Sequence, residues 1–422
     1  MVDNFNILEF AGLNDDKPWE LKEPTPTDLR AVVLGDSLCS IEELGACVAN
    51  VVGDTIEAEE LQPPGDDVPW ALRVRIEDVP TDIIFWVEQL SEATKTESKV
   101  DSGWILALQT VLHPGDPLTH LSNLIRLFGS LELPVHSVCD IATGRWFPKD
   151  SIQKVFIDSE IEPPEEILWI TRLVEAPEDV EPEDRWAWIS THGLNRCGRA
   201  ELEMFGVPGG VSTEAVHLVD GLAPLTLETA LPPEGQPISL GSQLLMSLMP
   251  CNQALNMLEE GMPGLEDHNT PTVAITAPDG AKVFPEHALL TLRQGGTSIM
   301  KTLRSTNRQS LHAQNTWDLL VSAVHQIGKS EHAACLAQVP WANTDDPDSP
   351  REYLWFTVEE ATDTHVVGVL AHTPALVTTL EEGHRETILK EDLSDWIVLT
   401  PVGPLGPSES ESILTFLDQF NN

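Results

Sequence analysis

Residues 104–141 read WILALQTVLHPGDPLTHLSNLIRLFGSLELPVHSVCDI, and this stretch decides the class of fold. The apolar run at 104–112 is short, continuous and followed by turn residues, so it predicts a strand. Leucine, isoleucine and phenylalanine then recur at helical spacing over 116–131, which predicts an amphipathic helix. The apolar stretch at 135–141 predicts another strand. Strand, helix and strand in succession indicate a mixed structure of helices and sheets.

A similar alternation precedes this stretch. A strand is expected at 29–35. A helix is expected at 40–51, because Ser40 and Glu43 have the spacing of a capping box. Two further strands are expected, at 70–77 and 83–88. The repetition leaves open that this part of the chain consists of two related α+β units.

Residues 29–290 are therefore expected to form a mixed, α/β-sandwich-like region. Residues 1–28 contain several prolines and aspartates, and we expect them to be a loose N-terminal lead-in. Near the end of the mixed region, a strand at 272–277 is followed by Asp-Gly at 279–280 and a short segment at 282–284. Asp-Gly suits the positive φ of a tight turn, so the pattern predicts a β-hairpin.

The chain changes character after residue 290. Helical spacing predicts a helical junction at 291–330, in which 315–327 is amphipathic. Short strands separated by polar loops then predict a small β-rich domain at 331–422, closed by a helix at 409–420. The predicted fold class is α+β.

The charge balance excludes several classes of partner. The 422 residues include 68 acidic and 24 basic side chains, a formal charge of -44. Duplex nucleic acid and anionic membranes are disfavoured as partners, because both bind proteins through lysine and arginine. Two interpretations stay open: adaptation to a salty cell interior, or an acidic surface that occupies a basic protein partner. The oligomeric state is not indicated.

The chain has no features of a membrane or secreted protein. No apolar run approaches the ~20 residues of a membrane span. The N-terminus MVDNFNILEF has neither the basic nor the apolar region of a signal peptide. The six cysteines are scattered without a CxxC pair, which favours reduced thiols over a disulfide scaffold. We expect a cytoplasmic protein.

The densest polar cluster is Thr191–Glu203, THGLNRCGRAELE, directly after an apolar strand. A catalytic interpretation takes His192 as the base and Cys197 as the nucleophile, with carboxylates from Glu201 and Glu203. The enzyme would be a hydrolase or transferase. The alternative is structural, with the arginines paired to acids and the glycines shaping loops. No HExxH, HxH, GxGxxG, GxxxxGK[ST] or GxSxG motif is present, so no metal or cofactor is predicted.

A basic window interrupts the acidic chain. Residues 287–317 contain no aspartate or glutamate. Lys301, Arg304 and Arg308 in this window are spaced by three and four residues, so a helix would place them on one face. One interpretation is a site that binds small anions or an acidic partner. The other is that these residues pack against the acidic surface of the protein itself.

Three C-terminal segments carry a recognisable pattern: EYLWFTV at 352–358, VVGVLA at 366–371 and EDLSDW at 391–396. They resemble the YegJ-type domain of unknown function, a small bacterial domain. Trp355 and Trp396 are natural core anchors in this pattern, and Gly368 and Gly383 suit bends or bulges.

The upstream segments PVHSVCDIATGRWFP, EEILWITRL and WISTHGLNRCGRAELEMFGVP resemble a family of uncharacterised bacterial proteins that carry this domain C-terminally. Together the resemblance covers about residues 30–402. It implies a two-part architecture and a bacterial cytoplasmic setting, with no activity or catalytic residues. The expected function is a non-catalytic binding or interaction protein with a strongly acidic surface. The alternatives are an enzyme acting at the 191–203 segment and a small-anion sensor at the basic helix.

Overall fold

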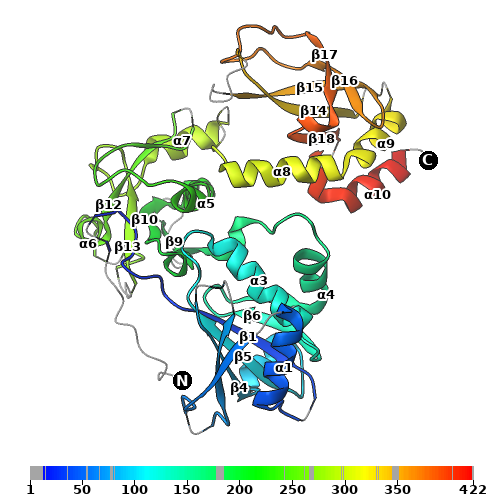
Figure 1. The fold of residues 1–422 in the computed structure, drawn as a ribbon. Helices are drawn as coiled ribbons and strands as arrows, with labels where there is room; N and C mark the ends of the chain where they lie inside the picture. Colours follow the sequence, from blue (N-terminus) through cyan, green and yellow to red (C-terminus); the bar gives the residue numbers. More distant parts are fainter. Residues whose placement is uncertain are drawn as a thin grey trace. The chain divides into compact units, whose positions relative to one another are not determined.

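The computed structural model describes residues 13–420 except 15, 36, 54–55, 66, 77–78, 80, 177–184, 242, 261, 266–269, 296, 298, 329, 331, 345–350 and 402. The fold is α+β, as predicted, with three mostly antiparallel sheets (Figure 1). The chain divides into two compact units, Met1–Lys301 and Thr302–Asn422. Unit 1 holds two of the sheets and unit 2 holds the third.

The first sheet of unit 1 has seven strands in the order β2-β3-β4-β5-β1-β6-β7. The strands are β1 (Thr27–Val33), β2 (Ile56–Leu61), β3 (Ala71–Ile76), β4 (Ile83–Gln89), β5 (Trp104–Thr110), β6 (Val135–Asp140) and β7 (Arg145–Pro148). Both segments that the sequence indicated as related units contribute strands to this single sheet. Helices α1 (Ile41–Val52) and α3 (Pro117–Ser130) pack on one of its faces and form its hydrophobic core.

Local sequence signals explain where these helices begin. The Ser40 hydroxyl accepts a hydrogen bond from the Glu43 amide, and the Glu43 carboxylate accepts one from the Ser40 amide, which confirms the predicted capping box. Helix α3 begins after Asp116, whose carboxylate accepts from the Thr119 amide, and has Pro117 at its first position. Its apolar stripe is fully buried, as the helical spacing predicted.

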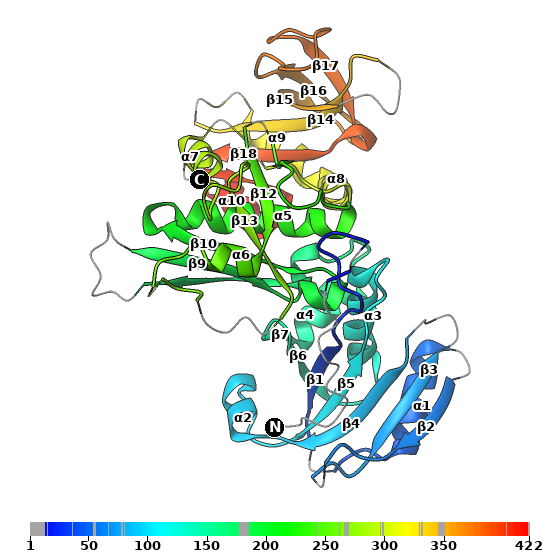
Figure 2. The same ribbon diagram turned by 90° about the vertical axis from the view of Figure 1, so that its left-hand side faces the viewer.

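The second sheet of unit 1 has the order β11-β12-β13-β10-β9-β8, with β10 and β13 parallel. Its strands are β8 (Ile170–Glu175), β9 (Trp186–His192), β10 (Glu201–Pro208), β11 (Ile238–Ser239), β12 (Leu245–Pro250) and β13 (Thr272–Thr276). Helix α5 (Ser212–Glu228) runs along β9 and β10 (Figure 2). The shorter helices of unit 1 are α2 (Glu92–Ser98), α4 (Lys149–Ile152), α6 (Cys251–Leu255) and α7 (Glu286–Gln294).

The predicted hairpin after β13 is wrong. The Asp-Gly turn forms, with Gly280 at φ +66°, and the Ala277 amide donates to the Lys282 carbonyl. No strand follows it at 282–284. The reason is that β12 and β10 already pair with the two edges of β13, so a hairpin partner has no edge to join.

Unit 2 is a six-stranded antiparallel sheet in the order β17-β16-β15-β14-β18-β19, with helices packed on it. Its elements are α8 (Leu303–Asn315), α9 (Trp317–Ile327), β14 (Ala334–Trp341), β15 (Glu352–Ala361), β16 (His365–Leu370), β17 (Arg385–Leu389), β18 (Asp395–Thr400), β19 (Gly403–Leu405) and α10 (Ser410–Phe420). The helical segment predicted as a junction is divided: α7 belongs to unit 1, whereas α8 and α9 belong to unit 2 and contribute to its core.

The tryptophans of unit 2 differ in their roles. Trp396 is fully buried, and its indole N–H lies 3.1 Å from the Thr316 hydroxyl, where α8 meets α9. It is the core anchor that the sequence predicted. Trp355 is only half-buried, because it points to the face of β15 opposite the buried Leu354 and Phe356, and that prediction is corrected. Gly368 lies opposite an irregularity in β15, as predicted for a bulge.

Candidate functional site

The segment 191–203 lies between β9 and β10 and is built from two strand ends and the short helix Leu194–Cys197. Only His192 and Arg199 have half-exposed side chains, and every other residue of the segment is buried. The segment therefore lies inside unit 1 rather than at an open cleft.

Arg196 forms a buried ion pair. Its guanidinium makes two parallel hydrogen bonds to the Asp140 carboxylate, of 2.7 and 2.8 Å, and also donates to the Leu168 carbonyl. The exposed fractions of the two side chains are 1% and 0%. Asp140 ends β6, so this buried ion pair ties the first sheet to the connection between β9 and β10. The pair is the kind of contact that the structural interpretation predicted.

Glu201 and Glu203 lie two residues apart on β10 and have separate partners. The buried Glu201 carboxylate accepts hydrogen bonds from the Thr191 hydroxyl at 2.7 Å and from the amides of Gly193 and Asn195 at 2.8 and 3.1 Å. Burial raises the pKa of Glu201, and these donors oppose that rise. The Glu203 carboxylate accepts from the Cys251 thiol at 3.4 Å. Because Glu201 binds the amides of Gly193 and Asn195, it holds the turn that carries Arg196.

His192 and Cys197 do not form a catalytic pair in the described part of the chain. The His192 Nε2 atom lies 3.2 Å from the Ser190 hydroxyl, and burial and the nearby Arg172 lower the pKa of His192. The Cys197 thiol is 1% exposed, lies 3.7 Å from the Gly193 carbonyl, and has its pKa raised to about 12 by burial. A nucleophilic cysteine must be a thiolate, so this geometry does not favour the catalytic interpretation.

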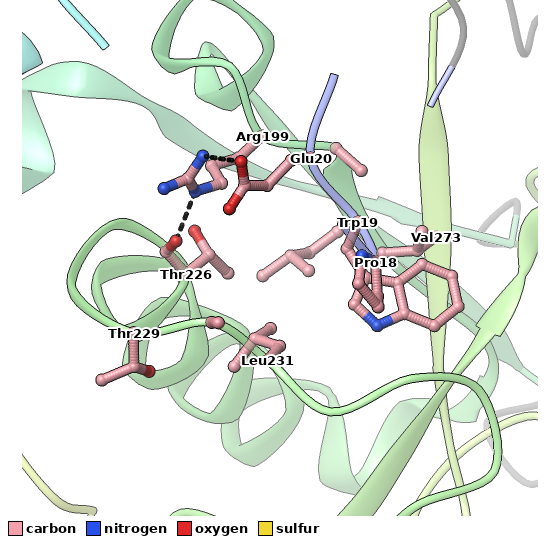
Figure 3. Close-up of a pocket in the computed structure, with 11 residues that line it drawn as sticks. Pro18, Trp19, Glu20, Arg199, Thr226, Thr229, Leu231 and Val273 are labelled. Carbon is pink, nitrogen blue, oxygen red and sulfur yellow. Dashed lines mark hydrogen bonds and ion pairs between the residues drawn. The ribbon is translucent and has the colours of Figure 1, made fainter. Parts of the chain in front are cut away.

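The same segment also receives the N-terminal lead-in. The Leu21 amide donates to the Gly198 carbonyl, and the Ala200 amide donates to the Trp19 carbonyl. Glu20 pairs with Arg199 at 3.4 Å, and Arg199 donates to the Thr226 carbonyl (Figure 3). This attachment corrects the expectation that the lead-in is loose, at least for its described residues.

Trp19 anchors the lead-in in the core. It is 8% exposed, and its indole N–H donates to the Pro232 carbonyl at 2.7 Å. The cavity beside it, lined by Pro18, Leu231 and Val273 among others, measures only about 10 Å³ (Figure 3). A cavity of that size holds at most one water molecule, so it is not a ligand site.

A much larger cavity lies within unit 2, and we call it the groove. It measures about 930 Å³, which is in the range of small-molecule sites. Its lining comes from α8, the ends of β14 and β15, β17, and the turn before β18. The lining residues are Leu303, Thr306, Asn307, Ser310, Gln314, Val339, Pro340, Trp341, Arg351, Tyr353, Glu386, Thr387, Ile388, Glu391, Asp392, Leu393 and Ser394.

The groove is acidic and partly aromatic. Its lining includes three carboxylates, from Glu386, Glu391 and Asp392, against the single guanidinium of Arg351. Trp341 and Tyr353 add aromatic surface, and Tyr353 is 40% exposed. Carboxylates attract cations, and aromatic faces bind them through their quadrupole. The groove is therefore suited to a cationic ligand.

Two contacts fix the walls of the groove. The Gln314 side chain on α8 donates to the carbonyls of Glu391 and Leu393, at 3.0 and 3.1 Å. The Ser394 hydroxyl donates to the Gln338 carbonyl of β14 at 2.9 Å. These contacts tie the turn that carries Glu391 and Asp392 to both a helix and a strand. The backbone that positions the two carboxylates is therefore fixed.

The predicted basic residues do not line the groove. Lys301 is the last residue of unit 1, and Arg304 and Arg308 lie one turn apart on α8 in unit 2. Both arginines are half-buried. Burial and the neighbouring Arg308 lower the pKa of His312 on the same helix. Anion binding by Lys301, Arg304 and Arg308 stays a prediction.

We also searched the described residues for metal sites and membrane-spanning helices. Within the described ranges, no three His, Cys, Asp or Glu side chains come together as metal ligands would. None of the helices in the described part of the chain combines the length and the apolar character of a membrane span.

Two family models match parts of the chain. Residues 174–275 match a protein of unknown function (DUF4026), C-terminal. Residues 305–407 match an uncharacterized protein conserved in bacteria (DUF2314). These matches support an uncharacterised bacterial family. No curated protein and no solved structure matches the chain.

The DUF4026 match runs from the end of β8 to β13, so it contains Arg196 but not its partner Asp140. The DUF2314 match begins within α8 and contains every residue that lines the groove except Leu303. Sequence reasoning did not find the groove, because its lining is scattered between residues 303 and 394 without a motif. The only available signal was the cluster of acids and Trp at 391–396.

Proposed function

We propose that this protein is a non-catalytic binding protein and that the groove of unit 2 holds a positively charged segment of a partner protein. The observation that supports this most directly is the lining of the groove, where Glu386, Glu391 and Asp392 outnumber the one cationic lining residue, Arg351. Outside the lining, the His384 Nε2 atom lies 3.2 Å from the Glu386 carboxylate. Trp341 and Tyr353 provide the aromatic surface on which lysine and arginine side chains pack.

The chemistry of the lining favours binding over catalysis. The residues that line the groove supply carboxylates, amides, hydroxyls and apolar surface, but neither histidine nor cysteine. Histidine is the side chain that most often acts as a general base, and it would activate a serine or threonine nucleophile. In unit 1, the candidate nucleophile Cys197 is a buried thiol. The proposal therefore assigns no reaction to the chain.

The overall charge supports the same partner chemistry. A formal charge of -44 attracts a basic protein over long distances and raises its rate of association. On this proposal the acidic residues form a surface that guides the partner, and the groove fixes one segment of it. We also propose a cytoplasmic setting, which the six free cysteines support, and a YegJ-like identity for the C-terminal domain.

The test is a titration of the full chain with a labelled nonapeptide of lysine, followed by fluorescence anisotropy. We expect saturable binding that weakens steeply as salt is added, since salt screens exposed charges. The groove variant Glu386→Gln, Glu391→Gln, Asp392→Asn removes three charges and should reduce affinity at least about tenfold. A nonapeptide of glutamate should not bind.

A charge-matched control separates the groove from the general field of the protein. Glu42, Glu60 and Asp101 are exposed acids of unit 1. Neutralising these three changes the net charge by the same amount, so affinity should fall about twofold or less. If both triple variants lose affinity equally, the groove is not the site, and the proposal fails.

A further inference from the structure

Strand β17 is the outer strand of the unit 2 sheet in the described part of the chain. It pairs with β16 on one side, with Glu386 opposite Gly368 and Thr387 opposite Val367. The strand is five residues long and contains no proline. An outer strand of this kind presents unpaired N–H and C=O groups, to which a further strand can bind.

The opposite edge of the sheet is less suited to pairing. Its outer strand, β19, has only three residues, and the middle one is Pro404, which has no N–H group to donate. Short strands and prolines are common ways to protect a sheet edge. The two edges are thus unequal, and β17 is the one open to a partner.

Two hydrogen bonds show which way the β17 backbone points. The Lys390 amide, just after the strand, donates to the Thr364 carbonyl on the β16 side at 3.0 Å, whereas the Thr387 amide, three residues earlier, donates to the carboxylate of its neighbour Glu386 at 2.9 Å. In antiparallel pairs, successive residues direct their N–H groups alternately toward and away from the neighbouring strand. Thr387 therefore directs its N–H to the open edge, where the Glu386 side chain covers it.

This open edge belongs to the groove. Glu386, Thr387 and Ile388 all line it. Polar side chains of α8 line the groove as well: Thr306 and Asn307 are neighbours in sequence, and Ser310 follows one turn later. The edge of a sheet therefore meets an acidic cavity, and one ligand can use both features.

We propose that the partner segment enters the groove as an extended strand that pairs with the open edge of β17. This inference rests on the proposed function and adds the conformation and the chemistry of the ligand. The carbonyl of the incoming strand accepts the Thr387 N–H in place of Glu386, and the released Glu386 carboxylate binds a lysine or arginine side chain of that strand. Glu391 and Asp392 attract further cationic side chains. The binding mode is β-strand addition.

If the ligand binds as an added strand, its affinity depends on the backbone N–H groups at every second residue of the peptide. Only every second N–H of an added strand donates to β17, and the others point away. The probe is a nonapeptide that alternates lysine and valine, in two forms: one N-methylated at every lysine, the other at every valine. One form should lose affinity at least about tenfold, and the other should change about twofold or less.

Two variants of the protein test the same contact. Thr387→Pro removes the N–H at the open edge, where proline is tolerated because that N–H makes no bond within the sheet. It should reduce affinity for the lysine–valine peptide about tenfold while the thermal midpoint of unit 2 is kept. Thr387→Val retains the N–H and should therefore lose much less affinity than Thr387→Pro. Amide exchange at Thr387 should slow when the peptide binds.

The outcomes distinguish this inference from the proposed function. If both N-methylated forms bind as well as the unmodified peptide, strand addition is overturned, although the groove variant can still show that the groove is the site. If the groove variant itself retains full affinity, the proposed function fails as well. The N-methylated peptides keep the test decisive even if Thr387→Pro does not fold.

Discussion

The Arg196 guanidinium and the Asp140 carboxylate form a bidentate ion pair in the interior of unit 1, with nitrogen–oxygen distances of 2.7 and 2.8 Å. Thr143 also donates to Asp140 at 2.6 Å, and the Leu168 carbonyl accepts from Arg196. Removing two charges from water costs several kcal/mol per ion, which only good geometry and additional hydrogen bonds offset. Breaking such a pair leaves a buried charge without the partner that hydrogen-bonds to it.

Arg196→Met should therefore be among the most destabilising single changes in unit 1. It leaves the Asp140 carboxylate buried without its partner, and we expect a loss of about 3–5 kcal/mol in the free energy of unfolding. Arg196→Lys should recover part of the loss, because lysine has the charge but not the planar fork. Urea unfolding followed by tryptophan fluorescence measures both values.

An exposed pair provides the control for this change. Arg73 pairs with Glu59 at 2.9 Å and with Asp82 at 3.4 Å, and all three side chains are exposed to a considerable extent. Arg73→Met should cost less than about 1 kcal/mol, as is usual for surface pairs. Equal losses from the two substitutions would show that the Arg196 pair has no special role in stability.

The local structure of the chain could be predicted from sequence because its causes are local. The capping box at Ser40 and the buried stripe of α3 depend on residues three or four positions apart, and both formed as predicted. The α+β class follows from the order of such elements. The core position of Trp396 was also predicted, from its place in a recognised pattern.

The contacts that decide the candidate sites are non-local, and the sequence did not contain a signal for them. Arg196 was correctly placed in a polar cluster, but its partner Asp140 lies 56 residues away. The hairpin at 282–284 was wrong because β13 already had two neighbours, a fact of topology and not of turn chemistry. The groove is formed by side chains from several elements, so no window of sequence shows it.

Gly264 packs against two parallel aromatic rings, and this contact explains why glycine stands there. The rings of Trp188 and Phe205 lie 6.5 Å apart with an angle of 3° between their planes. A Cβ atom at position 264 would lie 2.7 Å from Trp188 Cγ and 3.0 Å from Phe205 Cδ1, and the backbone has φ +91°. Gly264→Ala should cost about 2–4 kcal/mol through overpacking and backbone strain, measured by thermal unfolding.

Gly235→Ala separates the cost of overpacking from the cost of backbone strain. Gly235 also has a positive φ, of +74°, but a Cβ atom there would have no heavy atom within 4 Å. Gly235→Ala should therefore cost only the backbone strain, about 1–2 kcal/mol. A similar loss for both substitutions would show that the aromatic rings move aside easily.

The cysteines should be largely unreactive in the native protein. Burial raises the pKa of Cys39 to about 11 and the pKa of Cys139, Cys251 and Cys335 to about 12, as it does for Cys197. Since only the thiolate reacts, these five should not be labelled by a disulfide reagent at neutral pH. Cys47 is half-exposed, so one thiol per chain should react quickly, and all six should react in urea.

Cys47→Ser identifies the reactive thiol. In this variant, the fast phase of labelling should disappear, while Cys197→Ala should leave it unchanged. Rapid labelling that persists without Cys47 would show that one of the buried cysteines becomes accessible in the native state. A fast phase lost with Cys197 would revive the catalytic interpretation of the segment 191–203.

Glu352 should make the stability of unit 2 depend on pH in the acid range. Its carboxylate accepts hydrogen bonds from the amides of Ala375, Leu376 and Val377, at 2.7, 2.8 and 3.0 Å, and so holds the loop after β16. Burial raises the pKa of Glu352, but the amide donors lower it by more, so it lies below the ordinary 4.5. A carboxyl with a lowered native pKa stabilises the fold above its unfolded pKa, and that contribution is lost as pH falls through the native value.

The thermal midpoint of unit 2 in the wild type and in Glu352→Gln tests this expectation. The wild type should be more stable above pH 4.5, and the difference should shrink as the pH falls below that value. Glu381→Gln removes one exposed carboxylate of the same unit and should leave the midpoint nearly unchanged across the range. A difference that grows toward acid pH would have the wrong sign, and it would mean that the three amides do not hold the charged form of Glu352.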